Sequence, residues 1–354
     1  MQTIKINPAN TKPARASILV VYTGGTFGMV YDTKNKQLIP FDFSQILDLM
    51  PEMARLDIEI AFTSLQTVID SSNMNPTIWA QIAQIIYENY AHYDGFVVLH
   101  GTDTMAYTAS ALSYMFLNLG KSVILTGAQL PIGVARTDAR ENLMTSLELA
   151  ATQRDGFCAV PEVAIYFNAQ LLRGNRAKKK ESSQLNAFRS ENYPVLAEAG
   201  VTIEFNWPYI KRYQFSNDFQ INTSCDTRVA ILKIFPGINQ SAVRAVLGAP
   251  DLRGVIIETF GAGNAPTELW FLKEIKLAIE RGMVLFNVSQ CDGGRVSQGY
   301  YQTSRFLGEV GVVSGGDITI EAAITKLMFC LGQSPDNEIV KLKLLNLIAG
   351  EMSA

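Results

Sequence analysis

Short apolar runs alternate with amphipathic segments along the first half of the chain. The apolar runs begin near residues 17, 58, 95, 122 and 161, and segments with helical periodicity separate them. Short apolar runs bounded by turn residues are typical of buried parallel strands, and a period of 3.6 residues indicates the helices that cover them. The pattern predicts a doubly wound, mostly parallel α/β sheet.

Three helices are expected in this half, and one loop. Residues 78–90, 104–119 and 138–151 place apolar side chains on one helical face, and Gly120 stands where a C-cap would end the second helix. Residues 30–40 are polar and have little periodicity. We interpret them as a flexible loop over the end of the first strand.

The pattern changes after residue 192. Residues 193–227 lose periodicity and contain several prolines and asparagines, which predicts a linker. A second α/β pattern follows it, with strands at 229–233, 254–258 and 283–288 and helices near 240–248, 267–281 and 319–331. We therefore predict a larger N-terminal α/β catalytic domain (1–192) and a smaller C-terminal α/β domain (228–354).

Composition narrows the class of partner. A chain of 354 residues with 48% hydrophobic residues has enough apolar surface for two cores. The net charge of −3 gives no basic face for nucleic acid or an anionic membrane. No apolar run approaches the length of a membrane span, and the first residues do not resemble a secretory signal. Four cysteines without CxxC spacing suggest reduced thiols, so we expect a cytoplasmic protein. Because the charge favours neither nucleic acid nor a membrane, we expect its partner to be a small molecule.

Threonines beside glycines follow two of the predicted strands. The motif TGGTFG (23–28) ends the first strand, and HGTDT (100–104) ends the third. Ligands bind at the carboxyl ends of such strands, where glycines let backbone N–H groups approach and a threonine hydroxyl can attack a carbonyl. Helix capping by Thr102 or Asp103 is the simpler alternative for each residue alone. A phosphate loop is disfavoured, because neither GxxxxGK[ST] nor GxGxxG occurs at these motifs.

Histidine is scarce, which limits the choice of catalytic base. Only His92 and His100 occur. His92 lies in a polar run and is interpreted as a surface residue, while His100 at a strand end is expected to hold a neighbouring loop by hydrogen bonds. The base is therefore expected to be a lysine, a tyrosine or a carboxylate.

The two threonine motifs together resemble the signature pair of the bacterial-type L-asparaginases. Three further stretches resemble the cytoplasmic type I branch of that family: DSSNM (70–74), RGNR (173–176) with the lysines after it, and FGAGNAP (260–266). The resemblance covers nearly the whole chain in order. It implies an asparaginase/glutaminase-like fold, hydrolysis of L-asparagine through an acyl-enzyme, and no metal or cofactor.

The resemblance also implies roles for individual residues. Thr26 is the implied nucleophile, and Thr102 with Lys179 forms a second reactive pair. The substrate-binding residues are implied to be Asp70, Ser71, Ser72, Thr102, Asp103 and Asn264, the last reaching the site of a neighbouring subunit in a homodimer or homotetramer. Lys178 and Lys180 flank Lys179, so a slip of one residue remains open.

The family's active-site tyrosine has no clear counterpart. Leu38 stands where the better-known relatives have it, and Tyr31 is near but out of register. The region around residues 293–301 resembles one that supplies a tyrosine in some branches, and ungapped counting favours Tyr301 over Tyr300. An exposed aromatic pair is the alternative.

Two positions in the second half of the chain concern regulation. Some type I members are activated by asparagine at a second site between subunits, near the cysteine that Cys291 matches. Glu258 stands where those enzymes have an arginine just ahead of their Tyr-Gly turn. A glutamate cannot pair with a ligand carboxylate, so we expect a weak or absent allosteric response.

The rivals are a non-enzymatic asparagine or aspartate sensor, which could dispense with Thr26 or Lys179, and the tRNA amidotransferase subunit of the same superfamily. The latter carries an extra N-terminal domain, for which the residues before 17 leave no room. Preference for asparagine over glutamine rests on the resemblance alone.

Overall fold

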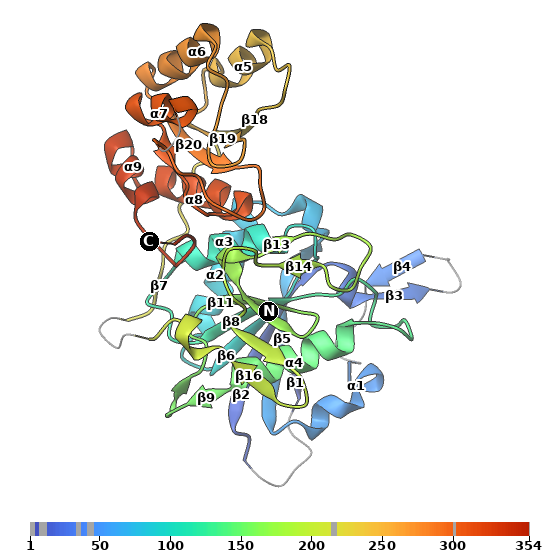
Figure 1. Ribbon diagram of the computed structural model, residues 1–354. Helices are drawn as coiled ribbons and strands as arrows, with labels where there is room; N and C mark the ends of the chain where they lie inside the picture. The colour runs from blue at the N-terminus through green and yellow to red at the C-terminus, as the bar shows by residue number, and fades with distance from the viewer. Residues whose placement is uncertain are drawn as a thin grey trace. The chain divides into compact units, whose positions relative to one another are not determined.

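The structure is a computed structural model that describes residues 4–6, 13–32, 37–40, 46–213, 218–299 and 302–353. The chain divides into two compact units, Met1–Asn222 and Thr223–Ala354. Each unit is built on its own sheet flanked by helices (Figure 1).

A nine-stranded sheet forms the centre of the first unit, in the order β1-β5-β2-β6-β8-β11-β12-β15-β16. The strands are β1 (Ile4–Ile6), β5 (Ile58–Ile69), β2 (Ala16–Gly24), β6 (Gly95–Leu99), β8 (Ser122–Thr126), β11 (Val163–Phe167), β12 (Gln170–Arg173), β15 (Ala197–Ala199) and β16 (Ile203–Phe205). The strands from β5 to β11 pair in parallel, and antiparallel strands extend both edges. The predicted doubly wound, mostly parallel sheet is confirmed.

Helices cover both faces of this sheet. Leu143 and Leu147 of α4 (Ala139–Ala151) share a core cluster with Ile18 and Val20 of β2. The alternate β2 residues, including Leu19, are equally buried but lie outside that cluster, since side chains alternate across a strand. The helices α2 (Pro76–Asn89) and α3 (Met105–Met115) cover that second face (Figure 1).

The first unit differs from the prediction at the end of α3. The helix was expected to reach residue 119, but Phe116 leaves it, and β7 (Phe116–Leu117) pairs with β17 (Gln220–Ile221). Gly120 is therefore not a C-cap, and its N–H donates to the Tyr90 hydroxyl at 2.8 Å. A partner strand that is a hundred residues away leaves no signal in local periodicity.

Two segments expected to be irregular contain strands. Within residues 30–40, β3 (Met29–Asp32) pairs with β4 (Gln37–Pro40) as a hairpin. The expected linker 193–227 contains β15, β16 and β17, so the first compact unit continues to Asn222. Strands of two or three residues are too short for an alternating pattern to be recognised, which is why the sequence suggested a linker.

The second unit holds the parallel sheet β18 (Val229–Lys233), β19 (Gly254–Thr259), β20 (Val284–Ser289) and β21 (Val313–Ser314). The predicted helices are present as α5 (Gln240–Leu247), α6 (Leu269–Glu280) and α8 (Ile320–Gln333). Two helices were not predicted, α7 (Gln302–Glu309) and α9 (Asn337–Leu345). The short elements of the first unit are α1 (Ile46–Leu49), β9 (Gln153–Arg154), β10 (Phe157–Cys158), β13 (Lys178–Lys179) and β14 (Phe188–Arg189).

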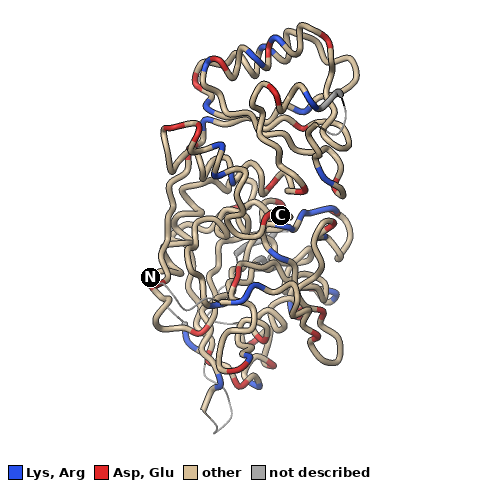
Figure 2. Tube along the Cα trace, turned by 60° about the vertical axis from the view of Figure 1, so that its left-hand side comes forward, with Lys and Arg blue, Asp and Glu red and all other residues tan. Residues whose placement is uncertain are grey.

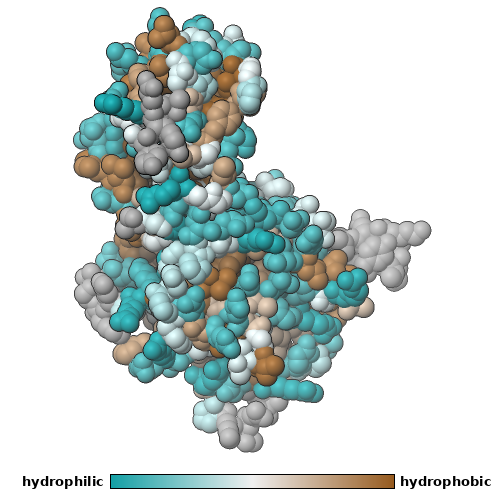
Figure 3. Space-filling model, in the orientation of Figure 1, coloured by the Kyte–Doolittle hydropathy of each residue, from teal (hydrophilic) through white to brown (hydrophobic). Residues whose placement is uncertain are grey.

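The surfaces of both units are mixed in charge. Cationic and anionic side chains are interspersed along the described chain (Figure 2). Exposed apolar residues gather on and just after α9, where Leu342, Leu345 and Leu347 are 61%, 54% and 47% exposed (Figure 3). In the ranges that the structure covers, no helix is long and apolar enough to cross a membrane.

A buried ion pair connects α8 to Glu351, near the C-terminus. Lys326 and Glu351 are fully buried, with Nζ and Oε1 2.6 Å apart. Lys326 also donates to the carbonyl oxygens of Leu344 and Asn346, and Glu351 accepts from the Ile348 N–H. The pair therefore joins α8 to the chain that follows α9.

Replacing Lys326 with methionine is expected to lower the free energy of unfolding by about 3–5 kcal/mol, because the Glu351 carboxylate is left buried and unpaired. Urea unfolding measures the loss. Lys341→Met is the matched control, since Lys341 pairs with the exposed Glu338, and it should cost less than about 1 kcal/mol. Equal losses of unfolding free energy in the two variants would contradict this role of the buried Lys326–Glu351 pair.

Candidate active site

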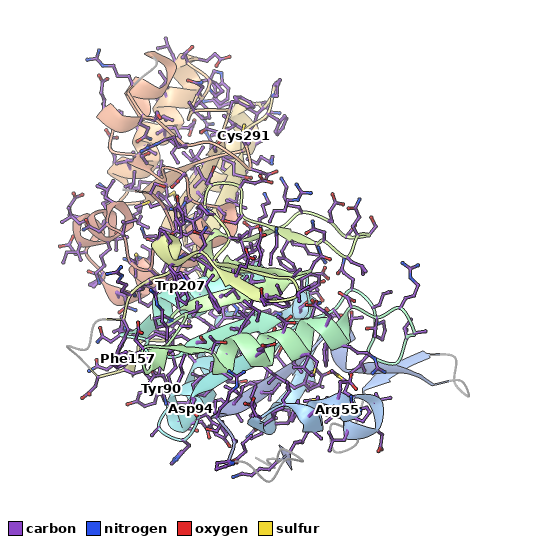
Figure 4. The ribbon with its side chains drawn as sticks, turned by 60° about the horizontal axis from the view of Figure 1, so that its bottom comes forward. Arg55, Tyr90, Asp94, Phe157, Trp207 and Cys291 are labelled. Carbon is purple, nitrogen blue, oxygen red and sulfur yellow. The ribbon has the colours of Figure 1, made fainter. Side chains whose placement is uncertain are left out.

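The predicted site residues of the first unit lie at one edge of its sheet. The loops after β2, β5 and β6 carry Thr26, Ser71 and Thr102, and these strands are adjacent and parallel, so their carboxyl ends share an edge. The opposite, amino edge is marked in Figure 4 by Asp94 and Phe157, which precede β6 and β11. This placement is the usual ligand position in an open α/β sheet.

Glycines allow the three loops to approach each other closely. Gly25 has φ +86°, and a Cβ built on it would lie 2.5 Å from the Cα of Gly101. A Cβ on Gly101 would lie 2.6 Å from the Ser71 Oγ. Both distances are shorter than real contacts, so a larger residue at either position would push the loops apart. The half-buried Thr26 and Thr102, each adjacent to one of these glycines, are therefore held in neighbouring loops.

Lys179 connects two of the predicted residues directly. Its Nζ donates to the Thr102 Oγ1 at 2.8 Å and to the Asp103 Oδ1 at 2.6 Å. The Lys179 side chain is 16% exposed and that of Asp103 is 68% exposed, so the ammonium is sheltered while the carboxylate faces solvent. Lys180 instead pairs with Glu191 at 3.6 Å. The geometry thus favours Lys179, rather than Lys180, as the lysine that acts with Thr102.

The Asp70 turn presents a carboxylate at the same edge. Asp70 caps the short helix η4 (Ser71–Asn73), and its Oδ1 accepts from the backbone N–H of Ser72 at 2.8 Å and from the Ser72 hydroxyl at 2.7 Å. The backbone hydrogen bond, followed by the hydroxyl, lowers the pKa of Asp70 below its usual value. The hydroxyl of Thr104 donates to the Ser71 carbonyl at 2.7 Å, which joins this turn to the Thr102 loop. An ionised, exposed carboxylate suits a substrate ammonium group.

His100 has a structural role, as expected, but its partners are the residue that follows it and α3 rather than a neighbouring loop. It is fully buried, with Nδ1 2.6 Å from the Gly101 carbonyl oxygen and Nε2 2.8 Å from the Thr108 Oγ1. A carbonyl only accepts, so Nδ1 carries the proton and Nε2 accepts from Thr108. Burial lowers the pKa of His100 from 6.5 to about 4, and the imidazole is neutral at neutral pH.

This pKa predicts a pH-dependent contribution to stability. Because the folded pKa lies below the unfolded one, the unfolded chain binds more protons between pH 6.5 and 4, and stability is lost as the pH falls through this window. His100→Asn should remove roughly 2 kcal/mol of the decline in unfolding free energy between pH 6.5 and 4.5. Urea unfolding at stepped pH measures the decline. The exposed His92→Asn variant serves as control, and parallel curves for all three proteins would refute the prediction.

The other predicted residues belong to the second unit, to β3 or to positions outside the described residues. Asn264 belongs to the second unit, in the turn after β19, where it bridges to Phe260. Tyr300 and Tyr301 lie outside the described residues. Tyr31 is in β3, with its backbone opposite Leu38.

Two further positions of the second unit concern the predicted regulation. Glu258 lies with its Oε2 3.8 Å from the Lys233 Nζ. Cys291 is an exposed free thiol (Figure 4). Among the described residues of both units, no group of three or more His, Cys, Asp or Glu side chains is arranged to hold a metal ion.

Gln129 is a further neighbour of this site, and it lies outside the five sequence motifs. It follows β8, and its side chain contacts the Thr102 hydroxyl at 3.1 Å. A single glutamine after a strand carries no recognisable motif, so only its spatial position reveals it.

Comparison with known proteins gives matches over both units. The family profile "Asparaginase, N-terminal" matches residues 17–211, and "Glutaminase/Asparaginase C-terminal domain" matches residues 228–342. The chain is similar to L-asparaginase 1 of Escherichia coli (strain K12), with 39% identity over 96% of this chain and 98% of that protein. It is also similar to the 60 kDa lysophospholipase of Mus musculus, with 40% identity over 89% of this chain and 58% of that longer protein.

A solved structure extends the comparison to three dimensions. L-asparaginase I from Vibrio cholerae matches with a TM-score of 0.87 and 40% identity, over 96% of this chain and 100% of that one. The residue ranges matched by the two family profiles include all five sequence motifs. The chain therefore belongs to the asparaginase family, in its N-terminal and its C-terminal domain alike.

Proposed function

We propose that this protein hydrolyses the side-chain amide of L-asparagine to L-aspartate and ammonia, with Thr26 as the nucleophile. The observation that carries the proposal is the Lys179 ammonium, hydrogen-bonded to both Thr102 and Asp103 at 2.8 and 2.6 Å, in loops that touch the Gly25 turn beside Thr26. Family membership supports the reaction class, and the geometry supports the division of roles.

The proposed reaction has two steps. The Thr26 hydroxyl attacks the amide carbon and loses its proton, the oxyanion is stabilised by backbone N–H groups near Gly25 and Thr102, and the nitrogen leaves as ammonia after it gains a proton. Water then attacks the resulting ester, assisted by Thr102 and Lys179, which frees Thr26 and the new carboxylate. Asp103 binds the substrate's α-ammonium.

The remaining site residues hold the substrate rather than react. Asp70, together with Asp103, accepts hydrogen bonds from the α-ammonium, and the Ser71 hydroxyl donates to the α-carboxylate. Ser72 holds Asp70 in place, because its N–H and hydroxyl donate to that carboxylate. Asn264 completes the site of a neighbouring subunit. Tyr301 is proposed to supply the active-site tyrosine, with Tyr300 and Tyr31 as the alternatives.

A homodimer or homotetramer in the cytoplasm is part of the proposal. The exposed leucines of α9 support self-association, because apolar side chains that gather on a surface mark interaction sites. The four free cysteines support a reducing compartment.

Ammonia release from L-asparagine and, separately, from L-glutamine tests the proposal. We expect turnover of asparagine with a hyperbolic dependence on its concentration, because Glu258 cannot pair with a ligand carboxylate as an arginine would. A sigmoidal curve that becomes hyperbolic on mutation at the subunit contact would contradict the expected weak or absent allosteric response. Binding of asparagine without any ammonia release would favour the sensor.

A further inference from the structure

Gln129 occupies a position between Thr102 and the loop that follows Lys179. Its Oε1 lies 3.1 Å from the Thr102 Oγ1, and its Nε2 lies 3.3 Å from the Ser182 carbonyl oxygen and 3.1 Å from that of Gln184. One side chain therefore contacts a reactive hydroxyl and the backbone of the segment that carries the lysine.

The direction of each hydrogen bond follows from the chemistry of the groups. Two backbone carbonyls can only accept, so the amide nitrogen of Gln129 faces them and its oxygen faces Thr102. That oxygen can only accept as well, so the Thr102 hydroxyl donates its single proton to Gln129. The Thr102 oxygen then accepts from Lys179, whose Nζ also donates to Asp103.

The backbone of Gln129 is fixed independently. The Asp138 carboxylate, at the start of α4, accepts from the N–H of Gln129 at 3.0 Å and from the N–H of Leu130 at 3.0 Å. A Cβ on Gly127 would lie 2.3 Å from the His100 carbonyl oxygen, so the loop after β8 is in contact with the loop that carries Thr102. These contacts leave Gln129 little freedom to turn away.

We propose that Gln129 is a positioning residue that orients the Thr102 hydroxyl proton away from Lys179 and couples Thr102 to the loop after that lysine. In the resting arrangement Lys179 is an ammonium that donates to Thr102 and Asp103. Thr102 transfers its proton to Lys179 only after the lysine has released one of its own protons to water and the hydroxyl has rotated away from Gln129. This inference rests on the proposed roles of Thr102 and Lys179. It adds Gln129 as the residue that sets the orientation of the Thr102 hydroxyl before the reaction.

Three variants of Gln129 test the inference. Gln129→Leu removes both sets of hydrogen bonds and should lower kcat roughly 10- to 100-fold with KM changed by less than about 3-fold, because misplacement of a reacting group reduces rate more than binding. Gln129→Met is closer to glutamine in shape and replaces Gln129→Leu if the leucine variant folds poorly. It should show the same loss of kcat. Gln129→Glu should move the acid limb of the pH profile of kcat to higher pH, since a nearby carboxylate favours the ammonium form of Lys179. The exposed Gln153→Glu is the charge control and should leave the profile in place.

A double-mutant cycle with Thr102→Val separates this inference from the function on which it rests. If Gln129 acts through Thr102, Gln129→Leu should change kcat by less than about 2-fold in the Thr102→Val background. An undiminished effect there, an unmoved pH profile, or kcat within 2-fold of wild type for Gln129→Leu would overturn the positioning role. Full activity of Thr102→Val alone would instead overturn the proposed function of Thr102.

Discussion

Thr26→Ala is expected to lower kcat for asparagine by about 10⁴- to 10⁶-fold, which is the scale seen when the nucleophile of a covalent mechanism is removed. The alanine cannot form the ester intermediate, so the remaining rate reflects water acting in an intact binding site. KM or the dissociation constant for asparagine should change little, because the residues proposed to bind the zwitterion are untouched. Ammonia release measures kcat, and calorimetry measures binding.

The matched control is Thr152→Ala. Thr152 ends α4, and its hydroxyl donates only to the Glu148 carbonyl at 2.7 Å. This variant should keep wild-type kcat. If Thr26→Ala retains more than about a hundredth of the activity, another hydroxyl is the nucleophile, and Thr102 becomes the first candidate.

Lys179→Met should lower kcat by about 10²- to 10⁴-fold, the usual contribution of a general acid or base. Methionine matches the lysine stem in length but offers no donor to Thr102 or Asp103. Asp103 is 68% exposed, so its carboxylate remains hydrated and the fold should stay intact. Far-UV circular dichroism and the thermal midpoint check the fold, and steady-state ammonia release gives kcat.

Lys180→Met is the decisive control for the register of the lysine run. Its partner Glu191 lies 3.6 Å away, in a half-exposed pair that contributes about 1 kcal/mol or less. Activity should therefore be unchanged. The reverse result, with Lys180 essential and Lys179 dispensable, would mean that the run is shifted by one residue in the working enzyme.

Local pattern was sufficient for the main elements of both sheets. The strands β2, β5, β6, β8 and β11, and the helices α2 and α4, begin within a few residues of their predicted positions. Parallel strands buried on both faces are short, continuously apolar and bounded by turn residues, and such a pattern is local. The strands β15 and β16, the last two in the sheet order, were missed, because three-residue strands are defined by their partners rather than by their own sequence.

The sequence by itself determined which residue types the site contains, since the threonine, glycine, aspartate and lysine motifs are each contiguous. Only the tertiary structure decided how they meet. The contact of Gly25 with Gly101, the hydrogen bond from Lys179 to Thr102 and the position of Gln129 join residues from different strand ends. Which parallel strands lie next to each other depends on the spatial order of strands in the sheet. The periodicity of a single strand does not encode that order.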